Sequence, residues 1–370
     1  MKQTTDNQYI HRAIKLARRG IGYVNPNPMV GSVIVKDGEI VGQGYHSCFG
    51  KEHAEIIALR NAGEKARDAT LYVNLEPCCH YGKTPPCTDA IIKAGIKRVV
   101  IGIVDPNPLV NQKGIEILKQ HQIEVTTGVE ESACKELNRV FIKYITTGMP
   151  YVTLKIAQSL DGRIATSTGN SQWITSHQAR VEAHRIRSES DAIIVGIGTV
   201  LADNPQLTVR HVKGRNPVRV VLDNHLQIPL QCQLLTDNHV HKTIVATTSK
   251  DTAKISRIEK TGVHVWQTEK NENGRISIPQ LLKKLANARM SAVMVEGGAR
   301  VYTSFLKEKM VDRIVMALAP KIIGTGIEAI GDLGILDVDN SIELINVKTK
   351  RLGPDLLVSA DVSYNSSEIG

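Results

Sequence analysis

Apolar residues follow two spacings along the first 148 residues, and the two spacings alternate. Runs with a period of three to four residues predict helices, whereas short apolar runs bounded by turn residues predict strands. The first helix is predicted to be capped by Asp6 or Asn7 and to end near Gly20. Because helices and strands alternate, we expect an α/β layered domain. Further helices are predicted over 53–62, 88–94, 113–121 and 130–145, and strands over 30–35, 40 onward, 71–75, 98–104 and 123–127.

The same alternation resumes after a clear break. The helix over 130–145 is followed by Gly148 and Pro150, which stop a helix, and an apolar strand restarts at Tyr151. We therefore predict two domains, 1–148 and 149–370, as suits a chain too long for one compact core. The stretch 251–275 shows little periodicity and is predicted to be ordinary surface. Strands of the second domain are predicted over 151–156, 191–197, 217–223, 243–247, 291–295 and 313–318.

Composition places the chain among ordinary globular proteins. Its 370 residues are 42% hydrophobic and 22% charged. The net charge of +9 is spread over both halves. Such a distribution suits anionic small molecules such as phosphates better than long nucleic acid, although plain solubility explains it equally well. The N-terminus is polar and no apolar run reaches membrane-spanning length, so we expect a cytoplasmic protein without membrane association.

Three of the six cysteines, Cys78, Cys79 and Cys87, lie within ten residues. In a reducing compartment such a cluster is more typical of a metal site than of disulfides. Cys78 and Cys87 follow His53 and Glu55 in the order H-x-E…P-C…P-C, which is the signature order of zinc-dependent base deaminases. We predict one Zn²⁺ per chain, bound by the histidine and these two cysteines, with water in the fourth position. Glu55 is then predicted to carry a proton from that water to the leaving amine.

The spacing departs from the common signature, because eight residues separate Cys78 from Cys87 where two are usual. Cys79 is closer, but neighbouring cysteines rarely bind one metal together. Residues two apart on a helix point about 200° apart, so we expect a helix to enter the site by its first turn. Alternatives stay open: buried free thiols beside an incidental histidine, or a closed structural zinc site with a fourth protein ligand. His46 and His80 are expected at the surface or behind the ligands.

Four stretches of the first half carry a further pattern: PNPMVG at 26–31, HAE at 53–55, EPCCHYGKTPPC at 76–87 and DPNP at 105–108. Together they resemble the deaminases of riboflavin biosynthesis. In that family the insertion between the two cysteine ligands is itself a feature, and a serine usually stands where this chain has Cys79. The resemblance implies a cytidine-deaminase-like α/β/α layered domain. Its substrate contacts would be Asn27, His46, Lys83, Asp105 and Asn107.

The second half contains six further stretches: LK at 154–155, SLDGR at 159–163, SQWIT at 171–175, GIGT at 196–199, LADNP at 201–205 and VEGG at 295–298. Together they resemble the reductase partner of bifunctional deaminase–reductase proteins. The resemblance weakens at about 225–285. It implies a dihydrofolate-reductase-like α/β domain that uses NADPH. The pathway intermediate would be a diaminopyrimidinone carrying a ribosylamino 5′-phosphate, which the first domain deaminates and the second reduces to a ribityl chain.

The resemblance also implies residue roles in the reductase. The substrate side would be lined by Lys155, Ser171, Leu207, Arg210 and Glu296. The nicotinamide cofactor would be faced by Ala157, Trp173, Arg187, Thr199, Asp203, Asn224, Gly298, Ala299, Arg300, Val301, Tyr302, Thr303 and Ser304. Without the family resemblance, the residues themselves give weaker support for these roles. No G-x-G-x-x-G follows a strand, and each of the glycine pairs at 196–198 and 297–298 suits a phosphate loop or a plain turn.

A different class of function shares the zinc signature: a nucleic-acid-editing deaminase with an accessory binding domain. Such an enzyme would need a basic, aromatic-bearing groove for a flipped base. Aromatic residues make up only 4% of the chain and its charge is dispersed, which favours a small phosphorylated pyrimidine as substrate. We expect no nucleic-acid partner. The sequence does not define an oligomeric state, and our expectation is a homo-oligomer, either a dimer or a tetramer.

Overall fold

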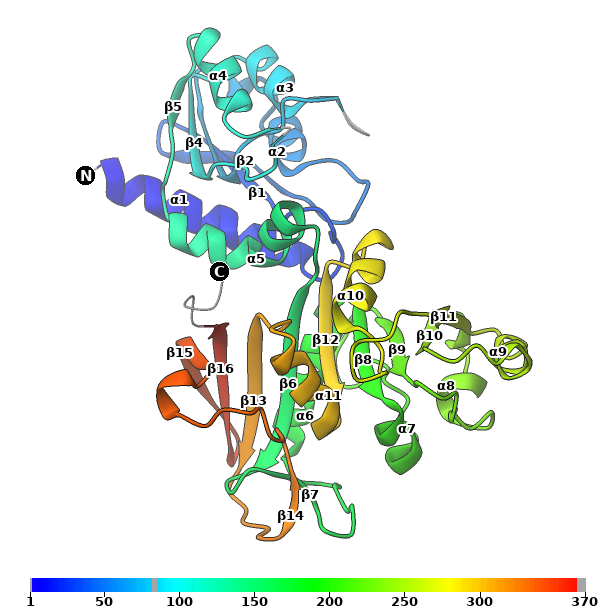
Figure 1. Cartoon of the computed structure of the whole chain (residues 1–370). Helices are drawn as coiled ribbons and strands as arrows, with labels where there is room; N and C mark the ends of the chain where they lie inside the picture. Colours follow the sequence, from blue (N-terminus) through cyan, green and yellow to red (C-terminus); the bar gives the residue numbers. More distant parts are fainter. Residues whose placement is uncertain (1, 82–84, 109, 365–370) are drawn as a thin grey trace. The chain divides into compact units, whose positions relative to one another are not determined.

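The computed structural model describes residues 2–81, 85–108 and 110–364 (Figure 1). Contacts within the chain divide it into two compact units, Met1–Met149 and Pro150–Gly370. Each unit is built on its own sheet of strands, and each is described separately below.

The first unit is built on a five-stranded sheet of order β2-β1-β3-β4-β5. The hairpin pair β1–β2 is antiparallel, as is β1–β3, whereas β3, β4 and β5 run parallel. The strands are β1 (Gly31–Lys36), β2 (Glu39–Tyr45), β3 (Thr70–Leu75), β4 (Arg98–Ile103) and β5 (Glu124–Thr126). The helices are α1 (Lys2–Ala17), α2 (Ala54–Ala62), α3 (Cys87–Lys93), α4 (Lys113–Gln120) and α5 (Glu131–Thr147), with short 3-10 turns at Arg18–Gly20 and Gly63–Ala66.

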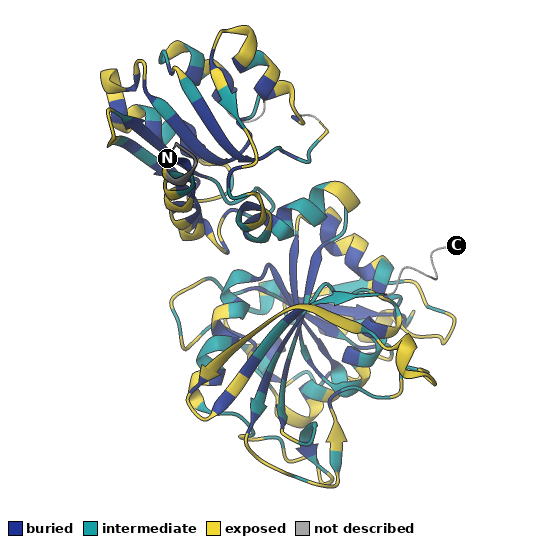
Figure 2. Cartoon of the chain, turned by 90° about the vertical axis from the view of Figure 1, so that its left-hand side faces the viewer, coloured by how far each residue is buried: buried dark blue, intermediate teal, exposed yellow. Residues whose placement is uncertain are grey.

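Helices cover both faces of this sheet, because the central strands are apolar on both sides. Ile10 and Phe141, from α1 and α5, pack with Val33 and Val100 on one face. On the other face, side chains of α2, α3 and α4 pack with alternate strand residues such as Leu71. The buried central strands stand out in Figure 2. This is the predicted α/β layered arrangement.

The expected cap of the first helix is wrong. The helix α1 begins at Lys2, so Asp6 lies within it and caps nothing. The Asp6 carboxylate is buried, accepts a hydrogen bond from the Tyr72 hydroxyl at 2.9 Å and pairs with Arg98 at 2.8 Å. This buried, hydrogen-bonded ion pair fixes the Asp6 side chain against β3 and β4. The partner lies 92 residues away, so no local pattern signals it.

The second unit is built on a nine-stranded sheet of order β11-β10-β9-β8-β12-β6-β13-β16-β15. Its first seven strands are parallel, and β16 and β15 add an antiparallel edge. The strands are β6 (Tyr151–Ser159), β8 (Ala192–Gly196), β9 (Val218–Leu222), β10 (Thr243–Thr247), β11 (His264–Gln267), β12 (Ala292–Gly297), β13 (Arg313–Ala319), β15 (Glu343–Leu352) and β16 (Asp355–Ser363), with β7 (Arg163–Thr166) and β14 (Gly326–Glu328) pairing separately.

Strand order explains how helices cover both faces of this sheet. From β6 to β11 the chain moves one way across the sheet, and from β11 to β13 it moves back. Right-handed crossovers then place α6 to α9 on one face, and α10 and α11 on the other, as Figure 1 shows for α10 and α11. The helices are α6 (His177–Glu189), α7 (Ile197–Asp203), α8 (Gln233–Thr236), α9 (Thr252–Glu259), α10 (Ile278–Asn287) and α11 (Ala299–Lys307), with 3-10 turns at Val240–Lys242 and Val338–Asn340.

Two parts of the second unit differ from the sequence-based expectation. The stretch 251–275 is not featureless surface, because it forms α9 and β11. The helix α9 is capped by the Asp251 side chain, which accepts a hydrogen bond from the Lys254 N–H at 3.0 Å. The strands β15 and β16 were not predicted. All residues of β15 except Leu352 are exposed, so its sequence carries no buried alternation. Among the described helices, none combines the length and the apolarity needed to cross a bilayer.

Candidate functional site

Two helix starts and one loop converge in the first unit. His53 is the N-cap residue of α2, and Cys87 is the first residue of α3. Cys78 lies on the loop that follows β3, three residues after the strand ends. The helix α2 therefore enters by its first turn, as the two-residue spacing from His53 to Glu55 requires.

The ligand atoms of His53, Cys78 and Cys87 all lie within 4.8 Å of one another. Nδ1 of His53 is 3.3 Å from Sγ of Cys87 and 3.5 Å from Sγ of Cys78. Tetrahedral zinc holds an imidazole nitrogen and a thiolate sulfur about 3.6 Å apart. The three residues thus fit zinc with three protein ligands. Among the described residues, no fourth histidine, cysteine or carboxylate joins them, so the group suits an open rather than a closed structural site.

Glu55 lies on the first turn of α2 and is 3% exposed. Its Oε2 is buried and makes no hydrogen bond to any residue that the structure describes. Burial raises the pKa of this carboxyl to about 7, although the nearby His53 opposes the shift. A buried carboxyl with a free oxygen beside the ligands is suited to accept and return a proton near neutral pH.

The two neighbouring cysteines differ in surroundings. A hydrogen bond from Cys87 lowers the pKa of Cys78 to about 4, and His53 acts in the same direction. The Cys87 backbone N–H also donates to Cys78 Sγ at 3.4 Å. For Cys79, in contrast, burial raises the pKa of the thiol. Cys79 and His80 lie outside the ligand group.

Most of the residues predicted to contact the deaminase substrate gather beside these ligands. The Asn27 side chain lies 3.2 Å from Nε2 of His46, and the other ring nitrogen of His46 lies 3.0 Å from the Glu52 carbonyl oxygen. The rings of His46 and His53 meet edge to face at 5.6 Å. Burial lowers the pKa of His46, which favours the neutral ring.

Two more residues of the predicted set, Asp105 and Asn107, lie on the turn after β4. Asp105 is buried, and its Oδ1 accepts the Asn107 N–H at 2.8 Å. Burial raises the pKa of Asp105 to about 6. Lys83, the remaining residue of the predicted set, lies outside the described residues.

A second cluster lies in the other unit, around Glu296 near the carboxyl end of β12 and Lys155 in the middle of the neighbouring strand β6. Glu296 accepts from Lys155 at 3.3 Å and from two nitrogens of Arg187 at 2.7 and 3.2 Å. Burial alone would raise the pKa of this carboxyl, but Arg187 and Lys155 lower it to about 2. Ligands of open α/β sheets bind at the carboxyl edge of the sheet.

The neighbouring loop carries two more of the predicted substrate residues. Arg187 donates to the Thr208 carbonyl oxygen at 2.6 Å, and Arg210 donates to the Thr208 hydroxyl at 3.0 Å. Leu207 is buried with a φ of 56°. The sequence reasoning missed His184, which accepts the Arg210 backbone N–H at 3.0 Å. A lone histidine carries no motif, so its seven-residue spacing from His177 on α6 was the only available signal.

The predicted cofactor residues lie along the same edge. Gly297, the last residue of β12, allows Thr199 to approach closely, because a Cβ at Gly297 would lie 2.8 Å from the Thr199 hydroxyl. Gly298 has a φ of 89° and is the N-cap residue of α11. Within that helix, the Tyr302 hydroxyl donates to the Lys155 carbonyl oxygen at 2.7 Å. The remainder of the predicted stretch is Ala299, Arg300, Val301, Thr303 and Ser304, all of α11.

The other cofactor residues are more scattered. Asp203 accepts a hydrogen bond at 3.3 Å from Ser171, a residue of the predicted substrate set, and Ala157 lies on β6. Trp173 is 63% exposed and lies under the Arg180 guanidinium at 4.4 Å. The Asn224 side chain is already engaged, since its Oδ1 accepts the Ile276 N–H at 2.9 Å. In the described part of the chain, no hydrogen bond or ion pair joins any of these side chains to Glu296.

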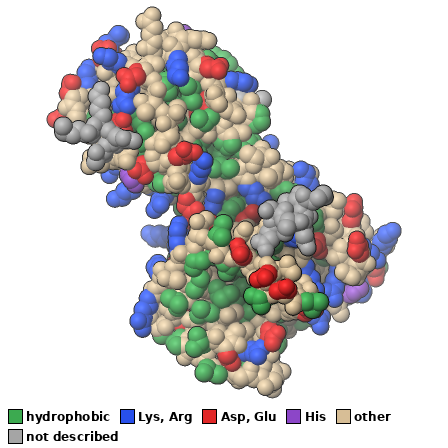
Figure 3. Space-filling model, turned by 60° about the vertical axis from the view of Figure 1, so that its left-hand side comes forward, with side chains coloured by type: hydrophobic (Ala, Val, Ile, Leu, Met, Phe, Trp, Pro, Cys, Tyr) green, Lys and Arg blue, Asp and Glu red, His purple; other side chains and the backbone are tan. Residues whose placement is uncertain are grey.

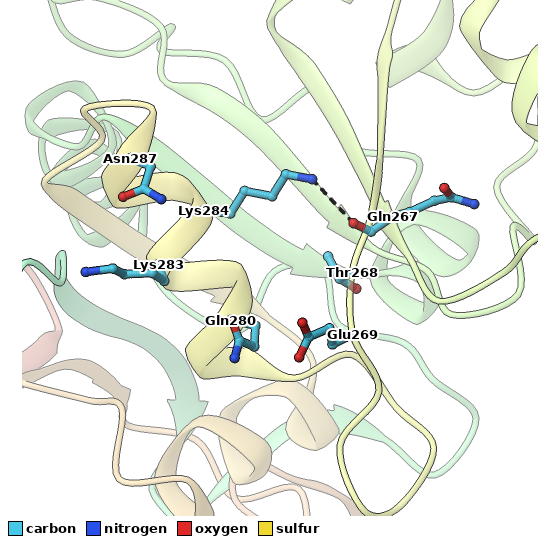
Figure 4. A pocket seen from close by; sticks show the side chains of 7 residues that line it. All are labelled: Gln267, Thr268, Glu269, Gln280, Lys283, Lys284 and Asn287. Atoms are coloured by element: carbon cyan, nitrogen blue, oxygen red, sulfur yellow. Dashed lines mark hydrogen bonds between the residues drawn. The ribbon is translucent and has the colours of Figure 1, made fainter.

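Two small pockets lie apart from these clusters. One, of about 200 Å³, is polar and lies between the end of β11 and α10 (Figure 4). Its residues are Gln267, Thr268, Glu269, Gln280, Lys283, Lys284 and Asn287. The other, of about 390 Å³, is lined by residues 6–7 and 126–130 of the first unit. Neither pocket contains a predicted site residue.

Fold and sites together define a two-domain α/β enzyme with a deaminase-type zinc centre and a separate reductase half. Comparison with protein families agrees. Residues 3–103 match the cytidine and deoxycytidylate deaminase zinc-binding region, and residues 150–358 match the RibD C-terminal domain.

Relatives align over nearly the whole chain. The riboflavin biosynthesis protein RibD of Aquifex aeolicus is 48% identical over 97% of this chain and 99% of its own. Two solved structures share the fold. RibD of Acinetobacter baumannii has a TM-score of 0.87 at 37% identity, covering 98% of this chain and 99% of its own. A deaminase/reductase of Thermotoga maritima has a TM-score of 0.86 at 39% identity, covering 98% and 100%.

The chain belongs to the RibD family of riboflavin biosynthesis. It is a bifunctional enzyme of small-molecule metabolism, with a zinc-dependent pyrimidine deaminase domain and an NADPH-dependent reductase domain. The predicted fold class, the two activities and the two cofactors are thereby confirmed.

Proposed function

We propose that the first domain deaminates 2,5-diamino-6-(5-phosphoribosylamino)pyrimidin-4-one and that the second reduces the product with NADPH to 5-amino-6-(5-phosphoribitylamino)uracil. The Thermotoga maritima relative is described as a diaminohydroxyphosphoribosylaminopyrimidine deaminase and 5-amino-6-(5-phosphoribosylamino)uracil reductase. The observation that carries the deaminase assignment is the approach of His53 Nδ1 to two cysteine sulfurs beside a buried Glu55.

His53, Cys78 and Cys87 are the proposed zinc ligands, and Glu55 is the proposed proton carrier. When bound, zinc acidifies a water molecule so that it can attack the pyrimidine ring near neutral pH. Glu55 takes the proton of that water and delivers it to the amine, which leaves as ammonia. Asn27 and His46 from one side, and Asp105 and Asn107 from the other, hold the ring, while Lys83 is the proposed contact to the phosphate.

In the reductase half, the proposed substrate residues are Lys155, Ser171, Leu207, Arg210 and Glu296. NADPH supplies a hydride for the sugar carbon that bears the amine. Two cations, Lys155 and Arg187, share the carboxylate of Glu296, and an anionic substrate would be attracted to them. This pairing favours a substrate-side role for Arg187 over the cofactor role expected from the sequence. The other cofactor residues named above remain our assignment for NADPH.

The order of reactions is tested with the phosphorylated diaminopyrimidine, with and without NADPH. We expect ammonia release without cofactor, followed by loss of NADPH absorbance only after deamination. Ammonia release that depends on NADPH would contradict the proposal. Ammonia release from RNA or single-stranded DNA, with none from the pyrimidine, would instead support the nucleic-acid alternative.

The role of Glu55 is tested by Glu55→Gln. The amide keeps the shape of the side chain but cannot carry the proton, so we expect ammonia release to fall about 100-fold or more. Zinc content, measured by atomic absorption, should stay at one ion per chain, and reductase turnover should not change. Unchanged deamination would contradict the proposed role of Glu55 as the proton carrier.

We also propose that the chain forms a homo-oligomer, and that it acts without a nucleic-acid partner. The homo-oligomer is supported by the exposed outer edge of the nine-stranded sheet. Figure 3 shows hydrophobic side chains gathered over the face that β15 and β16 form. Exposed apolar residues on an edge strand are a common site for pairing with a second copy. The cytoplasmic location stays a prediction.

A further inference from the structure

Glu76 follows β3 directly and is the residue that begins the cysteine loop. Its side chain is 3% exposed, although a carboxylate is rarely buried without a partner. Both oxygens are used. Oε2 accepts the backbone N–H groups of Asp105 and Gln112, each at 3.1 Å. Oε1 accepts those of Gly114 at 3.1 Å and Ile115 at 3.3 Å. Four backbone donors thus converge on one carboxylate.

These donors include the start of α4. The N-cap residue of that helix, Gln112, makes no capping hydrogen bond with its own side chain. The first N–H groups of a helix have no partner within it, and the helix dipole favours a negative charge there. Glu76 supplies both the acceptor and the charge from another part of the chain. It therefore fastens α4 to the loop that carries Cys78.

The fit between the two segments is close. A Cβ at Gly114 would lie 2.4 Å from the Pro77 carbonyl oxygen, so only glycine allows the helix start to approach the cysteine loop. On the same side, the Glu76 N–H donates to the Ile103 carbonyl oxygen at 3.0 Å, where β4 ends. One residue thus joins the ends of β3 and β4 and the start of α4.

The contact to Asp105 connects this junction with the substrate side. Asp105 is held through its backbone by Glu76, and its side chain in turn holds the Asn107 N–H. Cys78 lies two residues beyond Glu76 in the other direction. The separation between the ligand loop and the turn at 105–107 is therefore set by the four hydrogen bonds of one carboxylate.

We propose that Glu76 is a positioning residue of the deaminase, which holds Asp105 and Asn107 at substrate distance from the zinc ligands. It touches neither the metal nor the substrate. Its loss would consequently weaken substrate binding while the ligand set stays intact. The inference rests on the proposed deaminase substrate.

The test is Glu76→Gln in the full-length, zinc-loaded enzyme. An amide has one acceptor oxygen, and its NH₂ group would face two backbone N–H groups. We expect the KM for the diaminopyrimidine to rise about tenfold or more, as for the loss of hydrogen bonds to a charged group. The kcat should change less than threefold, zinc should stay at one per chain, and reductase turnover on deaminated substrate should be unchanged.

The matched control is Glu116→Gln, which removes the same charge from the exposed side of the first turn of α4. Its KM should stay within twofold of the native value. A similar rise in this control would assign the effect to helix charge and overturn the proposal. Loss of zinc in Glu76→Gln, or a fall in kcat at unchanged KM, would overturn it as well.

A second variant covers the case in which Glu76→Gln does not fold. Glu76→Asp keeps the charge but shortens the side chain by one methylene, so we expect a smaller rise in KM with full zinc. An unchanged KM in a zinc-loaded Glu76→Asp enzyme would then overturn the inference. If the native enzyme itself does not deaminate the pyrimidine, the proposed substrate is wrong, which is a separate result.

Discussion

Cys78 and Cys79 are adjacent in the sequence but have different chemical surroundings. Cys78 faces His53 and Cys87, and its thiol has a lowered pKa, whereas the pKa of Cys79 is raised by burial. Thiolate is the form that binds metal. We therefore propose Cys78, whose thiol lies beside the imidazole, as the ligand rather than Cys79.

This difference predicts opposite results for two substitutions. Cys78→Ser should lose zinc and deamination, because a serine hydroxyl is a poor zinc ligand, while reduction of deaminated substrate continues. Cys79→Ser should keep at least half of both activities and one zinc per chain. Zinc content and ammonia release measure the two outcomes. A zinc-free Cys79→Ser protein would mean that the ligand is Cys79.

His184 offers a prediction on pH. Burial, followed by the charges of Arg187, Arg210 and His211, lowers the pKa of this imidazole to about 3, and Glu296 opposes the shift. In the unfolded chain the ring titrates near 6.5. The folded-state pKa is thus depressed, and the neutral ring contributes stability above pH 6.5. That stability is lost as pH falls from 6.5 toward 3, by at most about 1.4 kcal/mol per pH unit.

The variant His184→Gln removes this titration but keeps an oxygen that can accept the Arg210 N–H. Between pH 7 and pH 5, the native protein should lose about 2 kcal/mol of unfolding free energy relative to the variant. Urea unfolding followed by a probe in the second domain measures the difference. His121→Gln, on the exposed end of α4, is the control and should follow the native protein. Equal pH dependence of native protein and His184→Gln would refute the prediction.

At the scale of elements, the local hydrophobic pattern predicted the buried strands, but it could not predict features that depend on residues far apart in the sequence. The strand at 243–247 was predicted to the residue, because its centre is apolar and all five residues are buried. The start of α1 was misplaced because the role of Asp6 depends on Arg98, far along the chain. The motif likewise predicted the group His53, Cys78 and Cys87, whose side chains lie together in the structure. It did not reveal the role of Glu76, whose partners lie 29 to 39 residues away.

The helix α5 carries a prediction at the same scale. It departs from helical geometry at Asn138, with φ −101° and ψ 15°. The Asn138 side chain accepts the Met29 N–H at 2.8 Å and donates to the Met29 carbonyl oxygen at 3.1 Å. Asn74 also donates to this carbonyl at 2.9 Å. These contacts hold the loop that presents Asn27.

Asn138→Ala leaves the Met29 N–H without this acceptor, whereas the carbonyl keeps Asn74. We expect unfolding of the first domain to become easier by about 1–3 kcal/mol, with a raised KM for the pyrimidine. Lys135→Ala, on the same helix, loses an exposed ion pair with Glu131 and should change stability by less than about 1 kcal/mol. Thermal unfolding and deaminase kinetics test both. A KM equal to that of the native enzyme would show that the loop keeps its position without Asn138.

At the scale of the whole molecule, the least predictable feature was the edge of the large sheet. The strand β15 pairs with β16 on one side, and no strand of the described chain lies on the other. The exposed fractions of Leu344, Ile345 and Val347 are 40%, 46% and 55%, and Figure 2 shows this strand exposed along its length. A strand that is exposed on its own but paired in an assembly has no buried alternation in its sequence. This is why the periodicity did not reveal it.

If this edge joins two copies of the chain, Val347→Lys should separate them, because a buried lysine without a partner opposes association. Light scattering should give a multiple of 40.6 kDa for the native protein and 40.6 kDa for the variant. Ile40→Lys is the matched control, since Ile40 is 45% exposed on β2, the edge strand of the other sheet. Dissociation by Ile40→Lys and not by Val347→Lys would place the interface on the first domain. A native mass of one chain would refute the homo-oligomer altogether.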